Sequence, residues 1–326
     1  MNVAIIQGIV LAFAFVVILM PAYIRLLRSV GFGKRVRVED GPEAHLSKEG
    51  TPTMGGLLLI VVVLLLATVF GAWEPSTAPT LLALLGVGIL GAIDDILNAL
   101  TGVGIRGRHK VIWQTVVAVV AAVYLQNHFG FTGFRAPFVG DLIVGPIPWI
   151  LLAAFAIVAS SNAVNLTDGL DGLASGLLIF ALLAFMAIAL LNVPTQSNLA
   201  LVCAIAAGTL VGFLWFNVHP ASIFMGDAGS LSFGAALAVT ALMTGQVLIL
   251  PVIGLVFVVE TGSVILQMGY FRLTHGKRIF LFTPIHHHFE LLGWPETKVT
   301  GRFWIIGALS GLLGVTLFLT SIRAIS

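Results

Sequence analysis

Two adjacent carboxylates near the end of a long apolar stretch are the first residues in this chain that could do chemistry. Asp94 and Asp95 close an apolar run that begins near residue 80. Ionisable side chains within membrane-length apolar segments are costly and usually functional. Successive helical side chains diverge by about 100°, so the pair does not simply cap one neighbour. The pair indicates a site that binds a cation or handles a proton; the alternative is the solvated end of a helix.

A third carboxylate, Asp227, lies in a glycine-containing segment, Gly226 to Ser230, just before another apolar run. The glycines allow close backbone approach, and the start of the following helix favours an anion. Taken alone, the segment is equally well explained by a turn with an N-capping aspartate. Because the chain also contains Asp94 and Asp95, a functional role for Asp227 is favoured.

Four carboxamides and carboxylates recur at every third position between two further apolar runs. They are Asn162, Asn165, Asp168 and Asp171. On a helix this spacing gives a slowly drifting stripe of oxygen ligands. Gly169 and Gly172 indicate that the helix is interrupted or closely approached there. Asp171 alone could cap the next helix, but a cap needs only one such residue.

These oxygen ligands favour a hard cation such as Mg²⁺, which proteins commonly hold with one or two carboxylates and substrate phosphates. Cys203 is the only cysteine, so one chain offers no disulfide and no thiolate metal site. The run His286–His288 suggests zinc instead. Three consecutive side chains cannot all converge on one ion, so contact with an anionic substrate is preferred and a metal role stays open.

The composition indicates which elements must hold these groups. Of 326 residues, 59% are hydrophobic and 9% are charged, whereas soluble domains have about 25% charged residues. The chain is predicted to be an all-α polytopic integral membrane protein, a single domain over residues 1–326, with no nucleic-acid partner. A bilayer core needs about 20 apolar residues per helix. On that criterion ten spans are predicted, near 3–27, 54–72, 80–100, 111–127, 146–162, 173–191, 199–216, 229–247, 250–272 and 303–322.

The basic residues predict the orientation. All Lys and Arg residues except Arg135 and Arg323 fall in odd-numbered loops. Cytoplasmic loops carry such an excess, so these loops are predicted to be cytoplasmic and both termini to lie outside. The polar motifs occupy the same side, which predicts one cytoplasmic site. Lys48 and Lys110 serve this orientation and are also candidates to hold phosphate.

One dinucleotide-like motif fails its context test. Gly86 to Gly91 fits G-x-G-x-x-G, but it sits inside an apolar span with no strand before it. Small residues for close helix packing explain it better, and the same interpretation applies to Gly208 and Gly212.

Together these motifs resemble the bacterial phospho-N-acetylmuramoyl-pentapeptide transferases, within the polyprenyl-phosphate N-acetylhexosamine-1-phosphate transferase superfamily. The resemblance covers almost the whole chain. Its pieces are Asp40 to Glu43, Gly50 to Gly56, Asp94-Asp95, Asn162 to Ala174, Gly226 to Ser230 and Pro284 to Glu290. The aspartate motifs are typical of the superfamily, and the threonine-proline and triple-histidine motifs are typical of the muramoyl-pentapeptide branch.

The resemblance implies ten transmembrane helices, dependence on Mg²⁺ and a cytoplasmic active site in the bacterial inner membrane. It implies transfer of phospho-N-acetylmuramoyl-pentapeptide from UDP-N-acetylmuramoyl-pentapeptide to undecaprenyl phosphate, which gives lipid I and UMP in peptidoglycan synthesis. It also suggests a homodimer.

The resemblance further implies roles for single residues. Asp94 and Asp95 match the catalytic pair, and Asp227 matches the main Mg²⁺ ligand, which also belongs to the catalytic group. The expected nucleotide-binding surface comprises Lys48, Asn165, Asp168, Gly169, Leu170, Asp171, Asn217 and Phe224. His286, His287 and His288 are expected beside the diphosphate or the sugar.

One position departs from the family pattern, which often has lysine three residues after the second aspartate. This chain has Asn98 there, so Lys110 is the candidate to supply that charge. A carboxylate could take the proton from the attacking phosphate, and Asp94 is predicted to be this base. Asp95 is predicted to support metal or phosphate binding. Direct attack and a covalent phosphoryl-enzyme both stay open.

Two other functions are weighed against this one. A sister transferase would use UDP-N-acetylglucosamine. A secondary transporter would carry a carboxylate-lined ion path, but transporters often show internal repeats, and none is found here. Glu260 and Gln267, on one face of a predicted span, have no assigned role.

Overall fold

The computed structural model describes residues 2–33, 48 and 50–325 of the chain, with side chains described for 3–33, 48 and 50–321. The long helices are α1 (Asn2–Ser29), α2 (Gly55–Val69), α3 (Ala78–Thr101), α4 (Gly107–Phe129), α5 (Pro146–Thr167), α6 (Leu173–Leu191), α7 (Ser197–Asn217), α8 (Gly226–Met243), α10 (Leu255–Leu273) and α12 (Glu296–Ile325). The short elements are β1 (Gly133–Ala136), β2 (Gly140–Ile143), α9 (Leu250–Ile253) and α11 (Ile285–Leu291).

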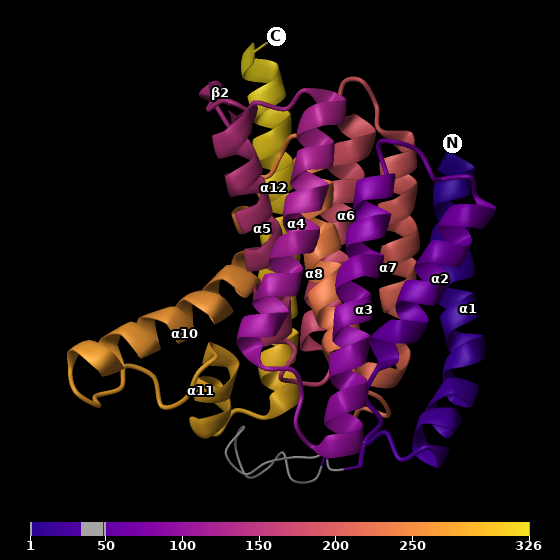
Figure 1. Ribbon diagram of the computed structural model, residues 1–326, viewed down its shortest axis with the longest axis vertical. Coiled ribbons are helices and arrows are strands. Elements are labelled where there is room, and N and C mark those ends of the chain that lie inside the picture. Colours follow the sequence, from indigo (N-terminus) through magenta and orange to yellow (C-terminus); the bar gives the residue numbers. More distant parts are fainter. Residues whose placement is uncertain (1, 34–47, 49, 326) are drawn as a thin grey trace.

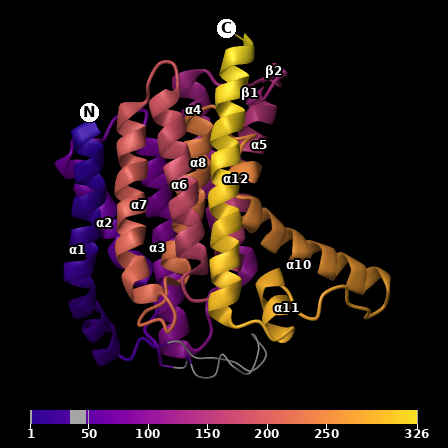
Figure 2. The ribbon, with the colours of Figure 1, turned by 180° about the vertical axis from the view of Figure 1, so that it is seen from behind.

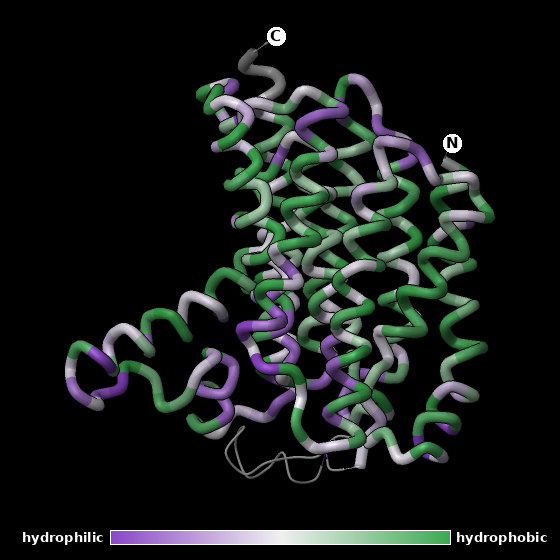
Figure 3. Tube along the Cα trace, viewed as in Figure 1, coloured by the Kyte–Doolittle hydropathy of each residue, from purple (hydrophilic) through white to green (hydrophobic). Residues whose placement is uncertain are grey.

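Most of the long helices run side by side in one bundle, and both ends of the chain lie at the same end of it (Figure 1). Helix α8 is the central element, packed against α3 and α5. Every residue from Ala228 to Met243 is buried. A helix that is apolar on all sides belongs in an interior. Figure 3 shows that the middle of the bundle is mostly hydrophobic, so the polar motifs are confined towards its ends.

Eight described helices are long and apolar enough to cross a membrane: α1, α3, α4, α5, α6, α7, α8 and α12. They agree with eight of the predicted spans. The predicted span 54–72 is represented by the shorter apolar helix α2. These elements support the prediction of a helical, polytopic membrane protein.

The structure differs from the prediction at span 250–272. The helix breaks at Gly254, and α10 projects sideways from the bundle (Figures 1 and 2). Pro251 lies in the first turn of α9, which suits the start of a helix, whereas the break itself falls at Gly254, the residue between α9 and α10. Polar residues on α10, including Glu260 and Gln267, also lower its hydropathy.

A small β-hairpin departs from the all-α prediction. Strands β1 and β2 pair antiparallel, with Phe134 opposite Leu142, in a loop predicted to be a simple connector. The Trp149 indole donates a hydrogen bond to the Gly133 carbonyl at 3.0 Å, which ties the hairpin to α5.

Glycines let α8 approach its neighbours closely. A Cβ on Gly91 of α3 would lie 2.3 Å from the Asp227 carbonyl oxygen, and one on Gly56 of α2 would lie 2.1 Å from the Gly229 nitrogen. Gly208 of α7 meets the backbone of α1 at Ile9 in the same way. The interpretation as helix-packing residues is confirmed for Gly91 and Gly208, where only hydrogen fits, but not for Gly86, where a Cβ would meet Val117 at an ordinary 3.4 Å.

Gly91→Ala is therefore expected to push α3 away from α8, at a cost of about 1–3 kcal/mol for overpacking. Gly86→Ala on the same helix is the matched control, because its Cβ would meet Val117 at an ordinary 3.4 Å. Thermal unfolding in detergent measures both. Equal midpoints for the two variants would contradict the close approach.

Candidate active site

A cavity of about 580 Å³ opens at the end of the bundle opposite the two termini (Figure 1). The ends of α3, α5 and α7 and the starts of α4 and α8 surround it. Its lining contains most of the predicted site residues, in the set Gly33, Thr53, Asp95, Asn98, Ala99, Lys110, Asn165, Asp168, Gly169, Leu170, Asn217, Phe224, Gly226 and Asp227. The motifs of five separate segments thus meet at one place.

Asp95 caps the central helix from outside it. Its Oδ1 accepts a hydrogen bond from the Asp227 backbone N–H at 3.1 Å, and its Oδ2 accepts one from the Ala228 N–H at 3.0 Å. The first N–H groups of a helix have no partner within it, and a carboxylate there is also stabilised by the helix dipole. Gly226, with φ of 74°, leaves room for this contact. Both oxygens of Asp95 are therefore engaged in holding α8 against α3.

Because Asp95 provides this cap, the Asp227 side chain does not have to. Its Oδ1 instead accepts a hydrogen bond from the Asn165 amide at 2.9 Å, and its Oδ2 lies 2.6 Å from the Lys110 ammonium nitrogen. The same Asn165 amide donates to the Ser230 hydroxyl at 2.9 Å. The predicted alternative of a merely N-capping Asp227 is thus replaced by a side chain that faces the cavity.

Lys110 joins two of the predicted catalytic aspartates. Its Nζ lies 2.8 Å from Asp94 Oδ2 and 2.6 Å from Asp227 Oδ2. Asp94 Oδ1 also accepts a hydrogen bond from the Ile105 N–H. The Asp94 side chain is only 6% exposed, whereas the Asp227 side chain is 22% exposed. Asp94 therefore lies behind Lys110, and Asp227 is the more accessible carboxylate.

This cluster has the composition of a site for a hard cation. Asp94 and Asp227 flank Lys110, and Asp95 accepts a hydrogen bond from the Asp227 backbone N–H, so three carboxyl groups lie close to one ammonium group. The Lys110 ammonium lies between the Asp94 and Asp227 carboxylates and supplies a positive charge to both. The available ligand atoms are oxygens, which suit Mg²⁺.

A second lysine joins two more carboxylates at the other side of the site. Lys48 Nζ lies 2.8 Å from Asp171 Oδ1 and 2.6 Å from Glu296 Oε1. Asp171 Oδ2 accepts a hydrogen bond from the Ala221 N–H at 3.0 Å and lies 3.0 Å from His219 Nδ1. Burial raises the pKa of Asp171, but the hydrogen bond and charge of Lys48 outweigh it and hold that pKa below its ordinary value.

The atoms of Asp171, His219 and Glu296 lie within 4.8 Å of one another and could hold a metal ion. The Lys48 ammonium, however, already supplies a positive charge to both carboxylates. Sequence reasoning missed His219 and Glu296. Glu296 lies in the first turn of α12, where an acidic residue is ordinarily explained by its favourable interaction with the helix dipole. Nothing in the sequence indicates that it pairs with Lys48.

Asn217 and Phe224 shape the wall between the two lysines. The Asn217 Oδ1 accepts hydrogen bonds from the Gly172 N–H and the Ser175 hydroxyl, both at 3.1 Å. Its amide donates to the Ile223 carbonyl at 2.9 Å. The Phe224 ring lies 6.0 Å from the Lys48 nitrogen. These contacts fix the loop after α7 against the loop before α6.

The three predicted histidines lie behind the cavity wall and are not among its lining residues. His286 is fully buried, and its Nδ1 lies 3.0 Å from Glu260 Oε2. His287 Nδ1 lies 2.7 Å from Glu290 Oε2, and His288 Nδ1 accepts a hydrogen bond from the Leu281 N–H at 3.2 Å. Their contact with substrate stays a prediction.

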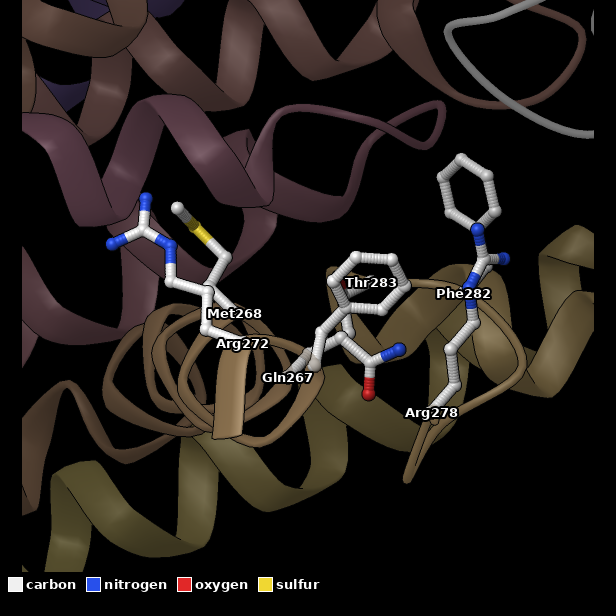
Figure 4. A pocket seen from close by; sticks show the side chains of 7 residues that line it. Gln267, Met268, Arg272, Arg278, Phe282 and Thr283 are labelled. Atoms are coloured by element: carbon white, nitrogen blue, oxygen red, sulfur yellow. The ribbon is translucent and has the colours of Figure 1, made fainter. Parts of the chain in front are cut away.

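Helix α10 and the loop after it enclose a separate cavity of about 380 Å³. Figure 4 shows Arg272 and Arg278 on opposite sides of it, beside apolar and aromatic side chains. Gln267 Oε1 accepts hydrogen bonds from the N–H groups of Ile279 and Phe280 at 2.9 and 3.1 Å. This gives Gln267 a structural role: it holds the loop on α10.

Asp171→Asn is expected to destabilise the fold in a pH-dependent way. Because the folded state lowers the pKa of Asp171, its stabilisation is fully present above the ordinary value of 3.8 and is lost as pH falls through the folded pKa. The difference in unfolding free energy between wild type and variant should therefore shrink under acid conditions. Denaturant unfolding in detergent at pH 7 and in acid measures it, and a pH-independent difference would contradict the pairing.

Comparison with known proteins shows which family the chain belongs to. Residues 77–245 match the family described as Glycosyl transferase family 4, and residues 48–60 match the Phospho-N-acetylmuramoyl-pentapeptide-transferase signature 1. A phospho-N-acetylmuramoyl-pentapeptide-transferase of Syntrophus aciditrophicus is 43% identical over 317 residues, covering 91% of this chain and 87% of the relative. One of Rubrobacter xylanophilus is 41% identical over 324 residues, covering 97% of each. The chain that builds this aspartate–lysine site therefore belongs to the phospho-N-acetylmuramoyl-pentapeptide-transferase family.

Proposed function

We propose that the protein transfers phospho-N-acetylmuramoyl-pentapeptide from its UDP carrier to undecaprenyl phosphate, forming lipid I and UMP. The observation that carries this proposal is the cavity in which Lys110 and Asp227 face the polar wall around Asp168 to Leu170, with Asp94 paired to Lys110 outside the lining. Transfer of a phosphoryl group needs charge stabilisation and positioning more than covalent help from the protein. This cavity offers both.

Mg²⁺ is the proposed cofactor. Asp227 is its proposed principal ligand, with Asp94 beside it, because their carboxylates already share a cation in Lys110. When bound, the ion would offset negative charge on the diphosphate.

The chain's own residues have separate proposed tasks. An anionic substrate attracts the Lys110 ammonium, which uncovers Asp94 as the base for the acceptor phosphate. Asp95 keeps α8, and with it Asp227, in position. The wall formed by Asn165 to Asp171, with Asn217, Phe224 and Lys48, holds the nucleotide half of the donor. Excess basic residues at this end of the bundle support a cytoplasmic site.

The central test uses the detergent-purified protein with Mg²⁺, a polyprenyl phosphate and one UDP-sugar at a time. UMP release with UDP-N-acetylmuramoyl-pentapeptide and none with UDP-N-acetylglucosamine is the expected result. The reverse preference would assign a sister transferase. Release with neither donor would overturn the proposal.

Asp94→Asn should lower transfer by about 10²–10⁴-fold, because an amide cannot accept the proton. The wild-type rate should fall as the pH becomes acid, whereas the residual rate of Asp94→Asn should not. Asp141→Asn is the matched control, since that carboxylate is exposed on the hairpin at the far end of the bundle. Steady-state rates across pH measure both variants. Near-normal transfer by Asp94→Asn with unchanged pH dependence would remove Asp94 from the mechanism.

We also propose ten membrane passes, with the broken α9–α10 segment as the ninth, in a bacterial inner membrane with both termini outside. Single-cysteine labelling is practical because the native Cys203 is buried. A membrane-impermeant maleimide should label Arg135→Cys in intact spheroplasts and Lys277→Cys only after lysis. Labelling in the opposite order would reverse the orientation.

A further inference from the structure

Glu260 and His286 form a fully buried pair outside the cavity. Both side chains have 0% exposure, and His286 Nδ1 lies 3.0 Å from Glu260 Oε2. The same oxygen lies 3.5 Å from the His286 backbone nitrogen. Burying ionisable groups is costly unless they are paired, so the contact constrains both residues. It joins α10, the projecting helix, to α11 (Figure 1).

The carboxylate defines how the imidazole is presented. An ionised carboxylate only accepts hydrogen bonds, so Nδ1 of His286 is the donor when Glu260 carries its charge. The other ring nitrogen, Nε2, is buried and has no hydrogen-bond partner. A carboxylate that orients a histidine in this way fixes both its tautomer and its ring plane.

The oriented ring lies directly against Gly169. A Cβ at position 169 would come within 2.3 Å of His286 Nε2. Gly169 also lines the main cavity, together with its neighbours Asp168 and Leu170. A continuous series of contacts therefore runs from Glu260 through His286 to the wall of the cavity.

We propose that Glu260 is a positioning residue for the transfer reaction: it holds His286 against Gly169 and so keeps the wall formed by Asp168 to Leu170 in place for the UDP-linked donor. This inference rests on the proposed function. Glu260 touches no substrate and acts through His286. It also makes the position of α10 part of the active site, because the carboxylate comes from that helix.

The kinetic test compares Glu260→Ala, Glu260→Gln and Thr261→Val. The amide oxygen of Gln still accepts the Nδ1–H bond, whereas Ala removes the acceptor. Thr261→Val is the matched control, since the Thr261 hydroxyl is buried on the same helix without a partner.

Glu260→Ala should lower kcat/KM for the UDP donor by about 100-fold through misplacement of the wall, with the KM for polyprenyl phosphate changed by less than about twofold. Glu260→Gln should recover most of this loss, and Thr261→Val should match wild type. An Ala variant as active as wild type, or one that weakens both substrates equally, would overturn the proposal.

A second measurement separates this inference from the proposed function. In ¹⁵N-histidine NMR of the full chain, the His286 signals are identified by their loss in His286→Gln. Nδ1 should be protonated in wild type and in Glu260→Gln. An unprotonated Nδ1 in wild type would overturn the contact. This readout needs no turnover, so it applies even if no UMP is released or if Glu260→Ala fails to fold.

Discussion

The site depends on one tertiary cap. The Asp95 carboxylate on α3 accepts the first backbone N–H groups of α8, and Gly91 and Gly226 leave the space that this contact requires. A buried helix start without partners would be expensive. Because α3 supplies the partner, Asp227 is released from capping and its carboxylate points to Lys110. The geometry of the charged cluster thus follows from how two helices meet.

Two lysines each join a pair of carboxylates, and only the first group contributes residues to the lining of the cavity, namely Lys110 and Asp227. Lys110 lies between Asp94 and Asp227, and Lys48 lies between Asp171 and Glu296. The two groups differ in how accessible their carboxylates are to a ligand. Asp227 is partly exposed, whereas Asp171 is buried and also accepts a hydrogen bond from the Ala221 backbone N–H. The first group is suited to exchange partners with a substrate or cation, and the second is suited to hold loops together. The enzyme is a phosphoglycosyl transferase by family.

The sequence predicted the membrane helices and the aspartate motifs because both signals are local. An apolar run of bilayer length identifies a helix, and a carboxylate in such a run identifies a costly group. It did not predict that Asp95 caps α8, since the partners are 132 residues apart. Nor did it predict that Glu296 joins Lys48 and Asp171, or that Glu260 pairs with His286. These contacts depend on tertiary packing, which no local pattern records. Gly254 was the available local signal for the break before α10.

The binding of a divalent cation tests the proposed role of Asp227 most directly. Mn²⁺, which prefers the same oxygen ligands as Mg²⁺, can be followed by electron paramagnetic resonance on the purified protein. Bound Mn²⁺ should be lost in Asp227→Asn and retained in Glu296→Gln, which alters only the Lys48 cluster. Mn²⁺ binding that survives Asp227→Asn, or that is lost in Glu296→Gln instead, would contradict a metal site between Asp94 and Asp227.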